Sequence, residues 1–210
     1  SLLIFAPLAA ALIALFIPAR LTKYFPVLAL TASFLQIAIL VRLVSDYDPS
    51  ASLQFLERQP WITLDLGSWG VLKAEYFLAI DGLNISFVCL TVAIMLIACL
   101  SSWRINKNVK GYFVLFLILN AAIIGTFTAL DFLLFYLFFE FMLLPMFFLI
   151  GMWGGPGREY ASIKFFLYTL LGSILISIPR LFGVQADFPS LGGMGIQVTT
   201  GLFGFLGVIV

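Results

Sequence analysis

The chain has 210 residues, of which 63% are apolar and 10% are charged, and its formal net charge is +1. A soluble domain has about a quarter of its residues charged, so the composition excludes an ordinary soluble enzyme and predicts an integral membrane protein. The near-neutral charge leaves no basic patch for nucleic acid. The sequence also lacks histidine, the side chain that titrates nearest to neutral pH.

Six apolar runs approach or exceed the length of about 20 residues that crosses a bilayer as a helix. They cover residues 2–19, 24–44, 77–101, 112–130, 132–150 and 161–178. The runs are apolar on nearly all faces, unlike the alternating strands of a membrane β-barrel. The fold class predicted for residues 1–178 is therefore an all-α, polytopic transmembrane helical bundle of about six helices.

The connections between the runs differ in charge on the two sides of the membrane. The short connections on one side carry the basic residues Arg20, Lys23, Arg104, Lys107, Lys110 and Arg158. The other side has a long acidic loop, residues 45–76, in which the partly alternating stretch from Trp61 to Trp69 with Gly67-Ser68 as a turn signal predicts a short hairpin. The positive-inside rule places the basic side in the cytoplasm and the N-terminus outside.

Glu140 is the ninth residue of the run 132–150. A carboxylate at this depth costs at least about 2.5 kcal/mol, so it is expected to face a protein interior or a wet cavity. Burial favours the protonated carboxyl and a nearby cation favours the charged one, so Glu140 is a candidate site for binding and releasing a transported proton. The alternative is a plain hydrogen bond to a neighbouring helix.

Pro145 follows five residues later in the same run. Proline removes one backbone hydrogen bond and clashes with the carbonyl four residues earlier, here that of Phe141, which predicts a kink or a broken turn beside Glu140. Broken helices with buried ionisable groups are common in the ion paths of transporters.

Lys164 is the next candidate, three residues into the run 161–178. Its depth differs from that of Glu140 by roughly 10 Å at the helical rise, which favours a water-linked relay over a direct ion pair, and snorkelling to the interface is the alternative. Tyr136, Tyr168 and Thr169 are candidates for polar support, because they could hydrogen-bond across helices or hold water.

The remaining polar and sulfur residues have structural interpretations. Asp81, near the start of the run 77–101, and Asp131, directly before the run 132–150, are each expected to cap a helix N-terminus. Cys89 and Cys99 share one run and are expected to pack as small apolar residues, so no metal site is predicted. No nucleotide loop, iron–sulfur motif or nucleophile constellation occurs, so neither redox nor hydrolytic chemistry is expected on this chain alone.

Several segments resemble one known family. They are LLFYLFFEFMLLPMFFLI at 133–150, REYASIKFFLYTLLGS at 158–173, FLERQPW at 55–61 and DGLN at 81–84. They resemble the N-terminal part of subunit M (subunit 4) of the proton-pumping NADH:quinone oxidoreductase, respiratory complex I. The chain starts at Ser1 without methionine and ends in an apolar stretch, so a fragment is expected. After Ser173 it departs from the family pattern, and residues 179–210 are expected to be an atypical Gly-rich tail, discontinuous or truncated.

The resemblance implies about fourteen helices in the membrane arm, with inverted repeats of broken helices and a proton path. The helix-5 glutamate of the family, here Glu140, pairs with a lysine on a seventh helix. Lys164 matches the family pattern but is not that lysine.

The function implied is proton translocation coupled to quinone reduction elsewhere in complex I. NADH, FMN, iron–sulfur clusters and quinone are expected on other subunits, and other membrane-arm subunits are the expected partners. The resemblance also implies a multi-pass protein of a bacterial plasma membrane. The alternatives are a cation/proton antiporter subunit of the Mrp type, an antiporter-like subunit of a membrane-bound hydrogenase, or a passive membrane scaffold.

Overall fold

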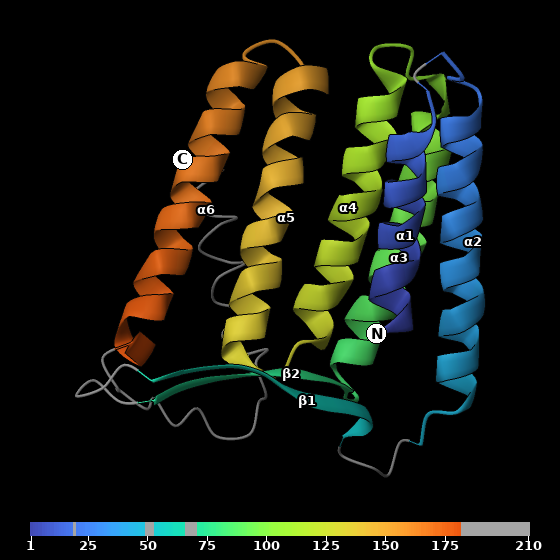
Figure 1. Ribbon diagram of the computed structural model, residues 1–210. Coiled ribbons are helices and arrows are strands. Elements are labelled where there is room, and N and C mark those ends of the chain that lie inside the picture. The colour runs from blue at the N-terminus through green and yellow to red at the C-terminus, as the bar shows by residue number, and fades with distance from the viewer. Residues whose placement is uncertain (19, 49–52, 66–70, 182–210) are drawn as a thin grey trace.

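The computed structural model describes residues 1–18, 20–48, 53–65 and 71–181, with the backbone alone at 62–65, 71–74 and 175–181. Across these residues six α-helices stand side by side, and one β-hairpin runs along one end of them (Figure 1). Their bounds are α1 Leu2–Phe16, α2 Tyr24–Ser45, α3 Asn84–Ser101, α4 Val109–Thr128, α5 Phe132–Trp153 and α6 Arg158–Leu181, with a short 3₁₀ turn, Ser102–Arg104, after α3. The helical bundle predicted from the apolar runs is confirmed.

The helices are suited to a bilayer by length and by surface. Within the described residues, α2, α3 with its 3₁₀ extension, α4 and α5 are each long and apolar enough to cross a membrane, and α1 is apolar but shorter. Large apolar side chains such as Phe16, Ile97 and Leu171 are exposed along the outer faces. In lipid these side chains face apolar acyl chains, so their exposure carries no hydrophobic penalty. The backbone polar groups are satisfied within the helices.

Helix α4 is the central element. It packs against α1 on one side and α5 on the other, while α6 packs on α5 at the edge of the row (Figure 1). Two-thirds of the apolar window of α4 is buried, the largest share among the four candidate spans. At Gly125 the two central helices approach so closely that a Cβ would lie 2.5 Å from the Phe138 ring of α5.

We expect Gly125→Ala to destabilise the bundle by about 1–3 kcal/mol, the usual cost of overpacking a close-packed interface. The new methyl group meets ring carbons of Phe138 on the α5 face and cannot avoid them without moving the ring. The matched control is Gly172→Ala in α6, where a Cβ meets nothing within 4 Å. The midpoint of detergent-induced unfolding should fall only for the Gly125 variant, and equal midpoints for both variants would contradict this packing.

The apolar run 77–101 is not one helix, contrary to the prediction. Residues Phe77 to Ile80 belong to strand β2, and α3 begins only at Asn84. The Phe77 carbonyl accepts a hydrogen bond of 2.9 Å from the Leu130 backbone N–H, in the turn between α4 and α5. The change from strand to helix occurs at Asp81, whose Oδ1 accepts from the backbone N–H of Asn84 at 2.7 Å. Asp81 thus bonds to backbone N–H groups at the start of α3, as a capping residue would, but the residue in the N-cap position is Leu83, whose side chain makes no capping hydrogen bond.

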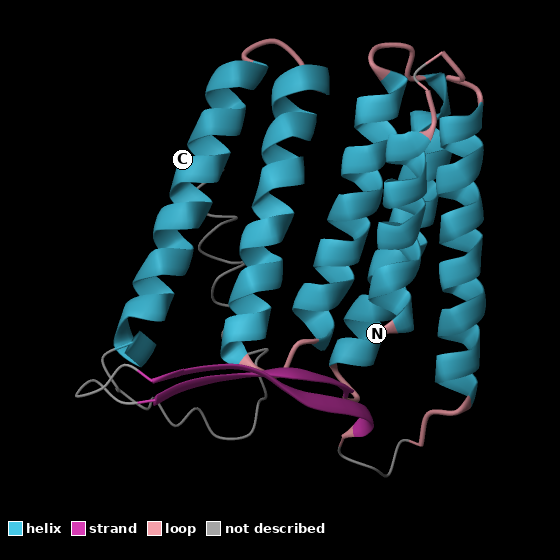
Figure 2. Ribbon diagram, viewed as in Figure 1, coloured by secondary structure: helices cyan, strands magenta, loops and turns pink. Residues whose placement is uncertain are grey.

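The loop 45–76 contains a hairpin, as predicted, but a much longer one. Strand β1 (Gln54–Asp65) pairs antiparallel with β2 (Val71–Ile80), and the hairpin lies across the ends of α4 and α5 (Figure 2). Gly67 and Ser68, the predicted turn residues, lie outside the described residues.

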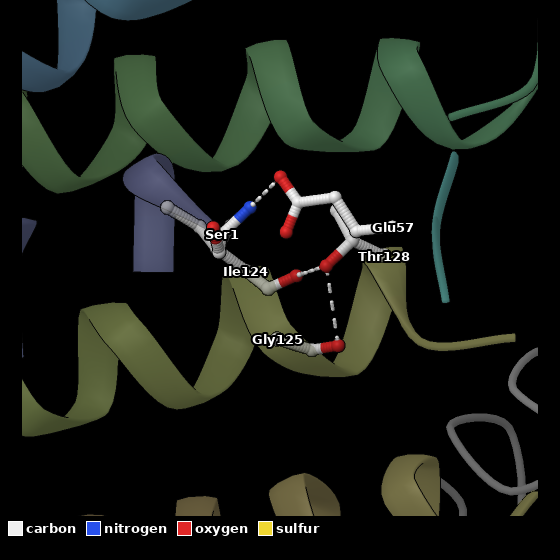
Figure 3. A network of polar contacts seen from close by, with 5 residues as sticks. All are labelled: Ser1, Glu57, Ile124, Gly125 and Thr128. Atoms are coloured by element: carbon white, nitrogen blue, oxygen red, sulfur yellow. Dashed lines mark hydrogen bonds and ion pairs between the residues drawn. The ribbon is translucent and has the colours of Figure 1, made fainter. Parts of the chain in front are cut away.

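Charged side chains pair along this hairpin. Arg58 donates from Nε to the Glu75 carboxylate across the strands, and this hydrogen bond raises the pKa of the Arg58 guanidinium. The Ser1 nitrogen lies 2.9 Å from Glu57 Oε1, so strand β1 comes close to the start of α1, and Thr128 at the end of α4 donates to the Ile124 carbonyl (Figure 3).

The opposite end of the bundle is basic. Lys110, in the first turn of α4, donates to the Leu15 and Ile17 carbonyls at 2.8 Å each and so binds the C-terminal end of α1. Lys107 donates to the Met152 carbonyl at 3.3 Å, near the end of α5. Cations are favoured at helix C-termini, where carbonyls lack intrahelical partners.

A buried amide pair compensates for a proline inside α1. Pro7 has no N–H, so the Leu3 carbonyl loses its normal intrahelical donor. The Gln36 side chain of α2 replaces it, donating from Nε2 to that carbonyl at 3.0 Å, and Asn120 of α4 donates from Nδ2 to Gln36 Oε1 at 2.6 Å. Gln36 and Asn120 are 1% and 0% exposed, so three helices are joined by polar contacts in the apolar core.

Candidate functional site

Asp131 sets the start of α5 and hence the depth of Glu140. Its Oδ1 accepts from the backbone N–H groups of Leu133 and Leu134 at 3.0 Å each, which confirms the predicted N-cap. Glu140 is eight residues after Phe132, about 12 Å from the start of α5 at the helical rise. The carboxylate therefore lies near the middle of a helix of 22 residues.

Glu140 is hydrogen-bonded to the neighbouring helix, as in the alternative left open by the sequence, although the sequence does not single out the partner residue. Ser173 of α6 donates from Oγ to Glu140 Oε1, with a separation of 2.5 Å between the two oxygens. Ser173 Oγ also lies 2.9 Å from the Leu170 carbonyl of its own helix, and its side chain is 3% exposed. The acid is thus bonded across the interface between α5 and α6.

Glu140 also lines a groove along α5 and α6. This groove has a volume of about 400 Å³, and Phe166 contributes to it from α6. Its lining is Leu133, Tyr136, Leu137, Glu140, Phe141, Leu144 and Phe166. Apart from Tyr136, the residues that line the groove with Glu140 are apolar. Glu140 is half-buried, so its ionisable group lies in surroundings that carry little compensating polarity.

The other predicted site residues lie on α5 and α6 and differ in their contacts. Pro145 is buried, and α5 is helical from Phe132 to Trp153 without interruption, so the predicted broken turn is not present. Lys164 extends its Nζ over the Tyr168 ring at 5.7 Å from the centroid, and Tyr168 is exposed. In the described part of the chain no ion pair joins Lys164 to Glu140.

Thr169 and Tyr136 complete the set. Thr169 donates to the Phe165 carbonyl of its own helix at 2.8 Å, whereas the prediction is a hydrogen bond across helices or a contact with water. Tyr136 stacks on Phe132 with 6.5 Å between ring centroids and borders the groove beside Glu140. Of the five supporting residues predicted, the structure therefore brings Tyr136 into the groove with the acid.

The sequence of this region matches a described family. A model of the membrane domain of NADH:quinone oxidoreductase and Mrp antiporter subunits matches residues 129–210, which include α5 and α6. Subunit M of the NADH-quinone oxidoreductase of Rhodobacter capsulatus is 41% identical over 186 residues, covering 85% of this chain and 34% of that protein. The chain belongs to the NADH:quinone oxidoreductase/Mrp antiporter family. It spans about a third of the length of the curated relatives that it matches.

Solved structures of the NADH:quinone oxidoreductase/Mrp antiporter family share the arrangement of helices. The chain is similar to one in respiratory complex I from Thermus thermophilus, with a TM-score of 0.70 and 22% identity over 98% of this chain and 41% of that one. It is also similar to a chain of the Mrp complex from Dietzia sp., with a TM-score of 0.57 and 19% identity over 96% of this chain and 22% of that one. At these identities the likeness shows the fold alone.

Proposed function

We propose that this chain is part of a proton-translocating membrane subunit of an NADH:quinone oxidoreductase, in which Glu140 binds the transported proton. The observation that carries the proposal is a half-buried carboxyl in the middle of α5, bonded to Ser173 and otherwise bordered by apolar groove walls. A carboxyl in such surroundings is costly and is retained where it serves transport.

The similarity to subunit M favours this function over the Mrp-type alternative. The curated relative from Rhodobacter capsulatus, a subunit M, is 41% identical over 85% of this chain. The passive scaffold is disfavoured because an apolar residue at position 140 would pack at the same depth without the cost of a carboxyl.

The redox chemistry that drives transport would be supplied by the rest of the complex. In this proposal NADH, FMN, iron–sulfur clusters and quinone are bound by other subunits, and redox turnover there biases the charge on Glu140. The basic end with Lys107 and Lys110 faces the cytoplasm and the hairpin end lies outside, following the positive-inside rule. The bilayer would be a bacterial plasma membrane.

Neutralising Glu140 tests the proposal. The variant Glu140→Gln keeps the size of the side chain and an oxygen that can accept from Ser173, so it separates charge from packing. Proton pumping by the assembled complex in membrane vesicles is the measurement, and loss of pumping with retained assembly is the expected result.

A further inference from the structure

We propose that Ser173 is a positioning residue that hydrogen-bonds Glu140 in both protonation states of the carboxyl, so that the proton can be gained and lost without a movement of helix α5 or α6. The inference rests on the proposed function of Glu140 and adds a second residue to that site.

The geometry places one hydroxyl between two acceptors. Ser173 Oγ is 2.5 Å from Glu140 Oε1 and 2.9 Å from the carbonyl oxygen of Leu170. A serine hydroxyl has one proton to donate and two lone pairs with which to accept. It can therefore donate to only one of the two neighbours fully at any time.

The two arrangements match the two states of the acid. When Glu140 is charged it can only accept, and the Ser173 hydroxyl donates to Oε1 in a charge-assisted hydrogen bond. When a proton binds to that carboxyl, the acid becomes a donor to Ser173 Oγ, and the hydroxyl proton rotates to the Leu170 carbonyl. The serine keeps its own proton throughout, and the bound proton stays on Glu140.

Because Ser173 is buried, its hydroxyl rather than water is the hydrogen-bonding partner of Glu140 on this side. The side chain is 3% exposed, so bulk water does not compete for the carboxyl from that direction. A fixed donor such as a backbone N–H can only donate to the carboxyl, whereas a hydroxyl can donate to the charged form and accept from the O–H of the protonated form.

Infrared difference spectra during a pH titration of the full complex in membranes test the proposal. The bands of Glu140, which are the carboxylate stretch of the charged form and the C=O stretch of the protonated form, are identified by their absence in Glu140→Gln. We expect Ser173→Ala to move both bands, and Ser173→Thr, which retains a hydroxyl, to leave both near their wild-type positions. Movement of the carboxylate band alone, or of neither band, would overturn the proposal.

Tyr136, Lys164 and Tyr168 are the other titratable side chains near this stretch of α5 and α6, and none of them is changed by the variants.

The matched control is Thr169→Val, because the Thr169 hydroxyl also bonds to a carbonyl of α6 but that carbonyl belongs to Phe165. It should leave both Glu140 bands in place. If Ser173→Ala does not assemble, Ser173→Cys retains a weaker donor and acceptor and should likewise move both bands. The bands are read without turnover, so normal pumping by Glu140→Gln would refute the proposed function and leave this hydrogen bond measurable.

Discussion

Replacing Glu140 with glutamine is expected to reduce proton pumping by about 10²-fold or more, the lower range for loss of a group that transfers protons. The complex should still assemble, because glutamine keeps an acceptor 2.5 Å from Ser173 and fills the same space beside the groove. The measurement is proton uptake into sealed vesicles during NADH oxidation, with subunit content checked on native gels.

Glu159→Gln is the matched control for this experiment. Glu159 is exposed in the first turn of α6, near the basic end of the bundle, and takes no part in the groove. The same change of charge there should leave pumping close to normal. Equal pumping by both variants and the wild type would exclude Glu140 as a proton-binding group.

Replacing Gln36 with leucine is expected to have the largest effect on stability. The change removes the donor to the Leu3 carbonyl and the acceptor for the Asn120 side-chain N–H, both in the buried core. Each buried polar group left without a partner costs about 1–3 kcal/mol. The midpoint of detergent-induced unfolding should therefore fall more for this variant than for Gly125→Ala.

Pro7 provides a direct check on the cause. In a Pro7→Ala background the residue at position 7 regains a backbone N–H, which can donate to the Leu3 carbonyl within α1. In that background Gln36→Leu should lower the free energy of unfolding by less than it does when Pro7 is present. The difference equals the contribution of the hydrogen bond to the Leu3 carbonyl. An equal cost in both backgrounds would show that the Gln36 contact to α1 contributes nothing, and a double-mutant cycle measures the difference.

Much of the bundle could be predicted from hydropathy, because a helix in lipid needs a continuous apolar stretch. The strand segment from Phe77 to Ile80 could not be predicted, since its four apolar residues continue directly into the apolar run of α3. Hydropathy does not distinguish four apolar strand residues from four apolar helix residues. The Asp81-Gly82 pair is the available signal, because a capping residue followed by glycine marks a helix start and so indicates that the residues before it belong to another element.

The polar contacts of the site were harder to predict than its acid. Glu140 can be identified because a carboxylate is rare in an apolar run. Ser173 is 33 residues away, and a serine hydroxyl can bond to a carbonyl of its own helix anywhere, so its position in the sequence gives no signal. The Gln36 contact had a usable signal. Pro7 inside a predicted helix frees the Leu3 carbonyl, and that carbonyl needs a donor from another helix.

The amide pair of Gln36 and Asn120, which compensates for Pro7, also bears on the leakage of protons through the bundle. Amide N–H groups do not release their protons near neutral pH, so the contacts from Leu3 through Gln36 to Asn120 can hold helices together without conducting charge. The polar contacts that join α1, α2 and α4 therefore offer no titratable group to a proton. The contact between α5 and α6, in contrast, contains the carboxyl of Glu140.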